Sequence, residues 1–225
     1  MRPYCICYMM TSIDGRVDCA MTEQLQGVSE YDQILRELDI PTTVSGRVTA
    51  ELEMALPGKF TSQNQEIIGK EAFSRKISAP GYEVVTDSKG TLLWEKESGK
   101  TNPHLILMST GASKAYADYL DKQNISWIAC GEGQVDLVRA SEILVSQFGV
   151  KRMGIVGGPV INTGFLQAGL LDEIVMLMGP GIDGRAGMPS LFEGRVDNRP
   201  VPLTLAEVKS CHDGAVMLRY RLIKE

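Results

Sequence analysis

The segment from Gly154 to Pro180 constrains the fold of this chain most, because it combines two apolar strand patterns with a helical period between them. Its sequence is GIVGGPVINTGFLQAGLLDEIVMLMGP. Strands are predicted over residues 154–156 and 171–178, and the helix between them is expected to end at Gly169. The segment is therefore predicted to hold two strands joined by a helix.

The turn Gly157-Gly158-Pro159 connects the first of these strands to the helix. Glycines let the backbone approach a ligand without an intervening Cβ, and a helix N-terminus attracts a phosphate. A tight turn without a ligand explains the same residues equally well. The turn alone thus leaves a phosphate site and a purely structural turn as alternatives.

The composition is that of an ordinary globular chain. Its 225 residues are 44% hydrophobic and 23% charged, with a net charge of −5, so we expect no nucleic-acid partner. No apolar run reaches the roughly 20 residues that span a bilayer, and we expect a cytoplasmic protein without membrane contact. The five cysteines and two histidines match no metal motif; Cys5 and Cys7 are expected to be buried, and His104 and His212 structural or exposed.

Strands and helices alternate along most of the chain. Strands are predicted over residues 2–10, 42–45, 82–86, 105–108 and 126–130, and helices over 113–123, over 135–148 and from Ser29 onward. Asp32 is expected to complete a capping box with Ser29. The alternation predicts an α/β fold with a mainly parallel sheet and helices on both faces.

The C-terminal part of the chain follows a different pattern. Residues 203–209 and 215–223 alternate apolar and polar side chains around a turn and predict an antiparallel hairpin. Residues 57–81 and 179–202 are irregular, apart from a possible helical turn over 66–73, and long loops of this kind often cover a site. Without a repeat or a linker, we expect a single domain over residues 1–225.

Glycine-bearing turns follow four predicted strands, at Asp14-Gly15, Gly46-Arg47, Gly131 and Gly157-Gly158. Ligands of open parallel sheets bind at the carboxyl ends of the strands, so several of these turns can converge on one crevice. Arg47 can hold a phosphate through two hydrogen bonds, and Thr49 offers a hydroxyl near a helix start. A turn, a surface arginine and a capping threonine are the simpler structural alternatives.

Few side chains in this sequence suggest catalysis on their own. The hydrolase motif Gly-x-Ser-x-Gly and the phosphate-loop consensus are both absent. A chain with few catalytic groups and many main-chain donors suits an enzyme whose cofactor carries the chemistry.

Three segments, in this order, resemble the reductase domain of riboflavin biosynthesis: RPYCICYMMTSIDGRV, VSGRVTAELE and GIVGGPVINTGFLQAGLLDEI. This domain is the C-terminal half of a bacterial deaminase/reductase and is related in fold to dihydrofolate reductase. The resemblance covers most of the chain and implies a mixed, mainly parallel central sheet with flanking helices. It also implies a homodimer that uses NADPH to reduce the ribosyl group of a ribosylaminopyrimidine 5′-phosphate to a ribityl group.

The resemblance also implies roles for individual residues. Glu53 is expected to deliver a proton, with Asp14 as a second candidate, since reduction at an imine-like carbon requires one. Substrate contacts are expected from Ser12, Asp14 and Val156. Cofactor contacts are expected from Met10, Gly46, Arg47, Thr49, Ser88, Gly157, Gly158, Pro159, Val160 and Gly164.

The chain departs from the family pattern where substrate binds. Val156 stands where the family commonly has Glu, and Glu53–Gly58 replaces a segment whose arginine helps bind the substrate phosphate. A pterin-like or other small electrophilic substrate is therefore an alternative, as is a non-catalytic nucleotide-binding role. Arg47, Lys89 and Lys114 are candidates for the cation that selects NADPH over NADH, and the sequence does not choose among them.

Overall fold

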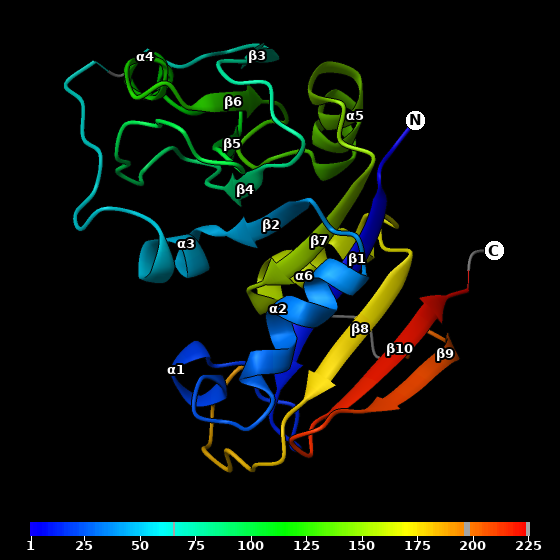
Figure 1. Cartoon of the computed structure of the whole chain (residues 1–225). Coiled ribbons are helices and arrows are strands. Elements are labelled where there is room, and N and C mark those ends of the chain that lie inside the picture. The colour runs from blue at the N-terminus through cyan, green and yellow to red at the C-terminus, as the bar shows by residue number, and fades with distance from the viewer. Residues whose placement is uncertain (65, 196–198, 224–225) are drawn as a thin grey trace. The chain divides into compact units, whose positions relative to one another are not determined.

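The computed structural model of the chain describes residues 1–64, 66–195 and 199–223, and its contacts divide it into two compact units (Figure 1). Unit 1 contains residues 1–3 and 41–153, and unit 2 contains residues 4–40 and the chain from residue 154 onward. The described residues form ten strands and six helices. The single-domain organisation stays a prediction. The irregular segments 57–81 and 179–202 include residue 65 and residues 196–198, which lie outside the described residues.

Unit 1 is built on five strands in the order β3-β6-β5-β4-β2. The parallel strands are β2 (Thr42–Gly46), β4 (Glu83–Thr86), β5 (His104–Met108) and β6 (Ser126–Ala129), and β3 (Ala72–Ser74) pairs antiparallel with β6. The helices that follow β2, β5 and β6 are α3 (Arg47–Glu53), α4 (Lys114–Lys122) and α5 (Leu137–Phe148). The mainly parallel sheet is thus confirmed in this unit.

One face of the unit 1 sheet packs against α4. Val85, Ile106 and Trp127 lie in one buried cluster with Tyr116 and Leu120 of the helix. These strand residues are one per strand on neighbouring strands, so their side chains form a continuous apolar surface. Burial of this surface, rather than helix propensity, holds the nine-residue helix in place.

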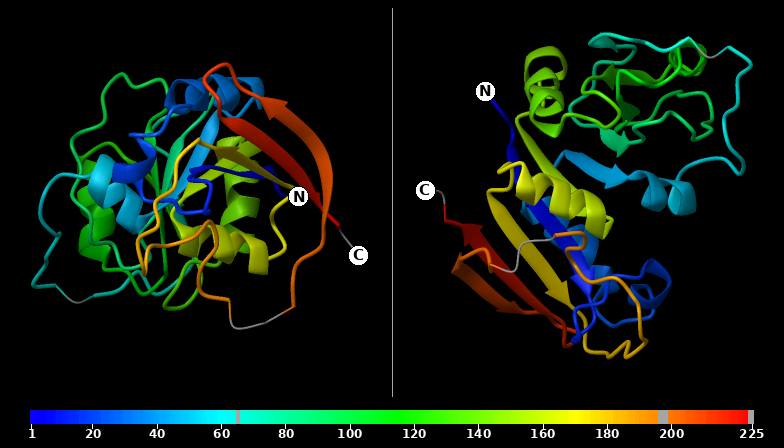
Figure 2. Two further views of the ribbon diagram at one scale, coloured as in Figure 1. Left: turned by 90° about the horizontal axis from the view of Figure 1, so that it is seen from below. Right: turned by 180° about the vertical axis from the view of Figure 1, so that it is seen from behind.

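Unit 2 is built on five strands in the order β7-β1-β8-β10-β9. Its strands are β1 (Tyr4–Thr11), β7 (Arg152–Gly157, whose first two residues belong to unit 1), β8 (Glu173–Met178), β9 (Leu203–Ser210) and β10 (Val216–Leu222). β1 and β8 are parallel, whereas β10 is antiparallel to both β8 and β9, which confirms the C-terminal hairpin. Helices α2 (Val28–Glu37) and α6 (Pro159–Gln167) cover opposite faces of this sheet (Figures 1 and 2), and α1 (Cys19–Thr22) is a single turn.

Successive side chains of β1 lie on opposite faces of the sheet, and both faces are buried. Tyr8 and Met10 pack against Ile34 of α2 in one cluster. Cys5 and Cys7 point to the opposite face and are both fully buried. Their expected role as small buried residues is confirmed.

The predicted capping box of α2 is wrong. The helix begins at Val28, and its N-cap is Gly27 in a left-handed conformation, so Ser29 and Asp32 do not form the cap. A Cβ on residue 27 would come within 2.6 Å of the Cβ of Ala215. The helix start is therefore set by packing against the distant hairpin, which no local motif reveals.

The helical turn expected over residues 66–73 is also wrong, because the structure has strand β3 at the end of this segment. Three residues are too few to display a period of two, and the strand exists only through its pairing with β6. The four-residue helix α1 was not predicted for the same reason of length.

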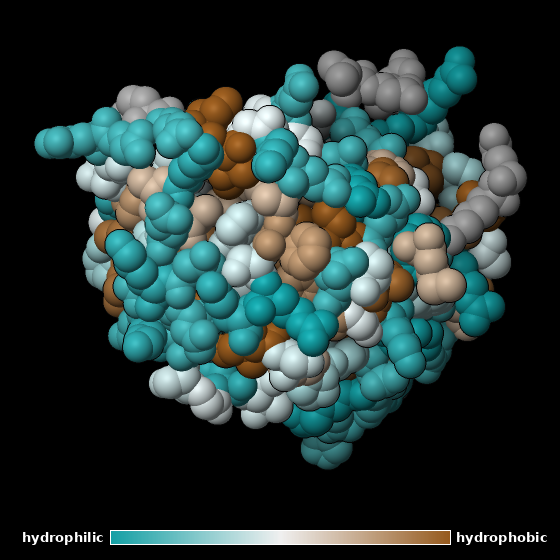
Figure 3. Space-filling model, turned by 90° about the horizontal axis from the view of Figure 1, so that it is seen from above, coloured by the Kyte–Doolittle hydropathy of each residue, from teal (hydrophilic) through white to brown (hydrophobic). Residues whose placement is uncertain are grey.

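The face that Figure 3 presents is predominantly hydrophilic, and its hydrophobic residues lie in separate patches. Among the described helices, none is long and apolar enough to cross a membrane.

Gly90 lies where no side chain fits. Its φ is +68°, and an added Cβ would lie 2.3 Å from the ring of Tyr116. We expect Gly90→Ala to lower the free energy of unfolding by about 2–4 kcal/mol, measured by chemical denaturation, through backbone strain and overpacking. In the control Gly99→Ala, φ is +71° but nothing lies within 4 Å of the added Cβ, and we expect a loss of about 1 kcal/mol. Equal losses in the two variants would contradict the packing argument.

Candidate functional site

Helices α3 and α6 begin directly at the carboxyl ends of strands β2 and β7, and each has a glycine as its N-cap. Gly46 and Gly158 are both extended and provide no side-chain hydrogen bond to the helix. In contrast, Ser113 and Asp136 cap α4 and α5 by accepting a backbone hydrogen bond. α1 and α2 also lack a side-chain cap, but neither follows directly on a strand. First-turn N–H groups at α3 and α6 can therefore face an anion.

The glycine turn before α6 has a backbone conformation that favours glycine. Gly157 is buried with a φ of +120°, and its peptide bond to Gly158 is cis. Pro159 is the first helical residue, where a missing N–H costs nothing. The side chain of Val160 is 74% exposed, and Gly164 follows one turn later on the same helix. The turn predicted from the sequence is confirmed as a structure, and its ligand stays a prediction.

Within unit 1, the turns after neighbouring strands lie at one edge of the sheet, here called the carboxyl edge of unit 1. Gly46 ends β2, and the carbonyl of Ser88, beyond β4, accepts hydrogen bonds from the N–H and hydroxyl of Ser109 at 3.0 and 2.9 Å. The carbonyl of Gly131, beyond β6, accepts from the N–H and hydroxyl of Thr110 at 2.9 and 3.0 Å. Three of the predicted site turns or residues are thus placed side by side. Convergence of these turns with those of unit 2 stays a prediction.

Three buried hydroxyls near the strand ends have no hydrogen-bond partner among the described residues: Ser45 on β2, Thr86 on β4 and Thr11 on β1. Buried polar groups are nearly always paired, so these hydroxyls indicate a polar ligand or water at the strand ends. Sequence reasoning missed all three, because a lone hydroxyl at a strand end carries no local signal. In unit 1, two of them, Ser45 and Thr86, lie beside the glycine N-cap of α3.

The other predicted cofactor residues differ in their exposure and in the groups that are available to a ligand. The side chain of Met10 lies in the core of unit 2, which leaves its backbone to line a site, and its contact with a cofactor stays a prediction. Thr49 is half-buried in the first turn of α3. The guanidinium of Arg47 bonds the carboxylate of Glu51 at 2.5 Å, one turn further along the helix. Glu53, the expected proton donor, is exposed at the last position of α3.

In unit 2, the tetrapeptide Ile-Asp-Gly-Arg occurs twice, at residues 13–16 and 182–185, and the two copies are bound together. The carboxylate of Asp14 accepts hydrogen bonds from the hydroxyl of Ser12 at 2.7 Å and from the N–H groups of Asp183 and Gly184 at 3.0 and 3.1 Å. The loop after β1 is thereby tied to the loop after β8. The repeated tetrapeptide was the one sequence signal that could have revealed this pairing.

These hydrogen bonds bear on the role of Asp14. They lower the pKa of its carboxyl group to about 2, with the bond from Ser12 contributing most. A carboxylate that stays ionised at neutral pH accepts hydrogen bonds well and donates a proton poorly. The geometry favours a structural role for Asp14 and leaves Glu53 as the better candidate for proton delivery. Ser12 is itself buried, and Val156 is half-buried on β7.

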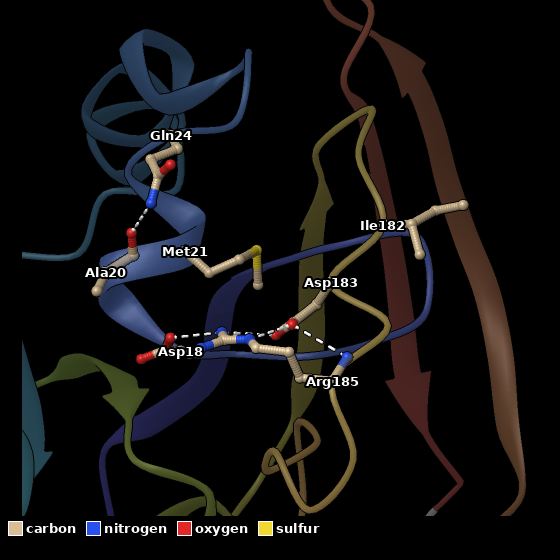
Figure 4. Close-up of a pocket in the computed structure, with 7 residues that line it drawn as sticks. All are labelled: Asp18, Ala20, Met21, Gln24, Ile182, Asp183 and Arg185. Carbon is tan, nitrogen blue, oxygen red and sulfur yellow. Dashed lines mark hydrogen bonds and ion pairs between the residues drawn. The ribbon is translucent and has the colours of Figure 1, made fainter.

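A hollow of about 250 Å³ lies between α1 and the loop after β8 (Figure 4). Arg185 lies between two carboxylates there, bonding Asp183 at 2.5 and 2.9 Å and Asp18 at 2.7 Å. Two carboxylates around one guanidinium give this group of side chains a net negative charge. The hollow is therefore poorly suited to a phosphate group, although it contains an arginine.

His104 occupies a structural position, as one of the alternatives predicted. It is buried at the start of β5, where its Nδ1 lies 2.6 Å from a carboxylate oxygen of Glu97. Among the described residues, no three His, Cys, Asp or Glu side chains are placed to hold a metal ion.

The tie between the two loops is expected to depend on pH. The lowered pKa of Asp14 means that folding stabilises its ionised form, so the tie is complete above about pH 4 and is lost as the pH falls toward 2. We expect hydrogen-exchange protection of residues 181–185 to fall across this window. Asp14→Asn should show several-fold lower protection already at pH 6, and a protection gap between variant and wild type that persists unchanged at pH 2 would contradict the argument.

Comparison with known proteins agrees with the resemblance. The model of the RibD C-terminal domain family matches residues 3–218. A pyrimidine reductase-like protein from Corynebacterium diphtheriae superposes with a TM-score of 0.72 at 17% identity, over 99% of this chain and 93% of that one. RibD of Acinetobacter baumannii gives 0.68 at 18%, over 99% and 58%. The riboflavin biosynthesis reductase Rib7 of Saccharomyces cerevisiae gives 0.63 at 17%, over 99% and 90%.

The solved structures share the fold, which confirms the expected dihydrofolate reductase-like mixed architecture. The family match spans both units and nearly the whole sequence. On this evidence, the chain belongs to the RibD C-terminal domain family.

Proposed function

We propose that this chain is an NADPH-dependent reductase that converts the ribosyl group of a ribosylaminopyrimidine 5′-phosphate to a ribityl group. Family membership supports the general role of an oxidoreductase. The observation that carries the proposal is the glycine N-cap at Gly158, which lies where strand β7 passes into helix α6. The unpartnered hydroxyls near the strand ends support it further.

In this proposal, main-chain groups do most of the cofactor binding. The N–H groups of Gly158 and Val160, at the start of α6, bind the cofactor diphosphate, because a helix N-terminus favours negative charge. Thr49 and the backbone of Met10 contribute as the resemblance implies, and Ser88 binds the adenosine end. When bound, NADPH supplies the hydride.

The protein itself must supply a proton. Reduction of the sugar adds a hydride to carbon C1′, and the heteroatom that leaves this carbon needs a proton. Glu53 is exposed at the end of α3 and is proposed as the donor, whereas Asp14 is committed to holding two loops together.

A second candidate function is the same NADPH-dependent reduction acting on a different substrate. Val156 replaces the family's usual Glu, and the segment after Glu53 lacks the arginine that helps bind a substrate phosphate. These departures favour a pterin-like or other small electrophilic substrate as the alternative. A homodimer is proposed in either case on the resemblance, and sedimentation equilibrium checks it.

Gly158→Ala tests the binding turn. Residue 158 has φ −79°, which alanine adopts without strain, so the added Cβ should act mainly on a ligand pressed against the backbone. We expect NADPH affinity, measured by isothermal titration calorimetry, to fall roughly tenfold or more, with the melting temperature of the free protein little changed. Gly99→Ala should bind NADPH like the wild type. Unchanged affinity in Gly158→Ala would remove the turn from the cofactor site.

Glu53→Gln tests proton delivery. We expect turnover to fall by roughly 10²- to 10⁴-fold at unchanged NADPH affinity, because the amide cannot donate the proton. Glu95→Gln, an exposed carboxylate on a loop of unit 1, is the control and should keep full turnover. Assays of NADPH oxidation with the phosphorylated pyrimidine and with dihydrofolate separate the two substrate classes. No oxidation with either substrate would favour the non-catalytic alternative.

A further inference from the structure

We propose that His104 and Glu97 form a pH-sensitive anchor, and that the chain segment after Glu53 loosens when His104 takes up a second proton. The anchor lies in and beside the chain that joins β4 to β5, residues 87–103, here called the β4–β5 connection. Its effect on the segment stands on contacts within unit 1. Its effect on turnover rests on the proposed function, because Glu53 is the proposed proton donor.

The anchor is a buried pair of side chains that is not fully satisfied. His104 is 5% exposed and Glu97 is 4% exposed, and Nδ1 of His104 lies 2.6 Å from Oε1 of Glu97. Because an ionised carboxylate only accepts hydrogen bonds, this geometry assigns the hydrogen to Nδ1. Nε2 of His104 and Oε2 of Glu97 have no hydrogen-bond partner among the described residues. Two unsatisfied buried atoms favour opening of the connection at this pair.

The imidazole is faced by charged groups from two elements. Glu97 and Lys100 belong to the β4–β5 connection, and Nζ of Lys100 lies 3.4 Å from both Oε1 of Glu97 and Nδ1 of the imidazole. Glu83 belongs to β4, and its Oε2 lies 3.3 Å from Nε2. The end of α4 contributes the uncharged Gln123 and Asn124, which bond the backbone of Glu97 at 2.8 and 3.3 Å. A second proton on the imidazole is thus placed in a buried site beside one ammonium and two carboxylates.

Burial has the largest influence on this second proton. It lowers the pKa of His104 below its ordinary value, and the ammonium of Lys100 lowers the pKa further, whereas the two carboxylates offset only part of the effect. A histidine whose pKa is lowered by burial binds its second proton more tightly once the site opens to water. The closed anchor is therefore favoured above pH 6.5, the ordinary pKa of histidine, and opening is favoured progressively as the pH falls below this value.

The β4–β5 connection also holds the segment formed by residues 54–60. The carbonyl of Leu93 accepts a hydrogen bond from the N–H of Leu56 at 2.8 Å, and the carbonyl of Thr91 accepts one from the N–H of Phe60 at 2.8 Å. The segment contains no helix or strand of its own. Its backbone position thus depends on where residues 91–93 lie.

Trp94 links the anchor to these main-chain hydrogen bonds. The centroid of its ring lies 4.7 Å from that of the imidazole, and its indole N–H donates to the hydroxyl of Tyr116 at 3.1 Å. The N–H and the carbonyl of Trp94 both bond the hydroxyl of Tyr119, at 2.6 and 2.9 Å. Because Trp94 directly follows Leu93, a displacement of the imidazole is passed through packed groups to the carbonyl that holds Leu56.

Glu53 is the last residue of α3 and directly precedes the held segment. A small misplacement of a catalytic group lowers the rate of reaction, since the reacting atoms must be aligned. Acidification is therefore expected to reduce turnover through the position of Glu53, although the imidazole itself touches neither substrate nor cofactor in the proposed function.

The test is amide hydrogen exchange of the whole chain between about pH 7.5 and 5.5, corrected for the intrinsic pH dependence of exchange. In the wild type, we expect the protection of the Leu56 and Phe60 amides to fall several-fold across this window. His104→Asn keeps a donor near the position of Nδ1 but does not titrate, so its protection should not change with pH. Lys100→Ala, at an exposed position, removes an ammonium that lowers the pKa of His104, and the fall should move to higher pH.

Two regions serve as references in the same experiment. The amides of β5 should stay protected, and so should residues 181–185, because the tie made by Asp14 is complete above about pH 4. Loss of protection in β5 together with Leu56 would mean that unit 1 unfolds as a whole, and would overturn the inference. Wild-type protection that is constant or rises on acidification would also overturn it, as would an equal fall in His104→Asn. If His104→Asn does not fold, a transition at the same pH in Lys100→Ala and the wild type overturns the inference.

Turnover provides a separate measurement that rests on the proposed function. The ratio of wild-type to His104→Asn turnover should fall several-fold from about pH 7.5 to 5.5. If the wild type shows no NADPH-dependent turnover, the proposed function fails, and hydrogen exchange still decides whether the anchor exists. A constant ratio with a loss of protection at Leu56 would retain the anchor and overturn its effect on Glu53.

Discussion

Main-chain N–H groups at the start of α6 are the feature on which the proposed cofactor site depends. In each unit a sheet strand passes into a helix through a glycine, and no side chain occupies the cap position. Such a cap costs only a few tenths of a kcal/mol relative to Ser or Asp, so the helices remain stable. Buried Ala50 and Phe165 anchor them to their units. Each unit can thus contain a helix without a side-chain cap at little cost in stability.

Carboxylates elsewhere in the structure are used to shape loops. Asp14 ties the loop after β1 to the loop after β8, and Asp87 folds the turn after β4 by accepting backbone hydrogen bonds. Both carboxylate oxygens of Asp183 accept hydrogen bonds from the guanidinium of Arg185. These acids fix the positions of the strand-end loops and are poorly placed for acid–base chemistry. This division of labour is consistent with an enzyme whose cofactor performs the central bond change.

Most secondary structure could be predicted because, in a long segment, the spacing of apolar residues indicates which face is buried and therefore whether the segment is a helix or a strand. The strand-turn-helix-strand segment after Gly154, the helix capped by Ser113 and the C-terminal hairpin all follow from local patterns. Strand β3 and the start of α2 did not, because one depends on pairing with β6 and the other on space beside Ala215. At the site, glycine turns were recognisable by composition, whereas the unpartnered hydroxyls were not, since burial is a property of the folded chain.

The sequence by itself determined the α/β class, the order of the elements, the resemblance to a reductase family and a set of candidate site residues. Tertiary structure decided which of these residues are available. It committed Asp14 to a loop contact and directed Arg47 and Lys114 toward carboxylates. The physical reason is that residue type and periodicity are local properties, whereas hydrogen-bond partners and ion pairs come from segments far apart in the chain.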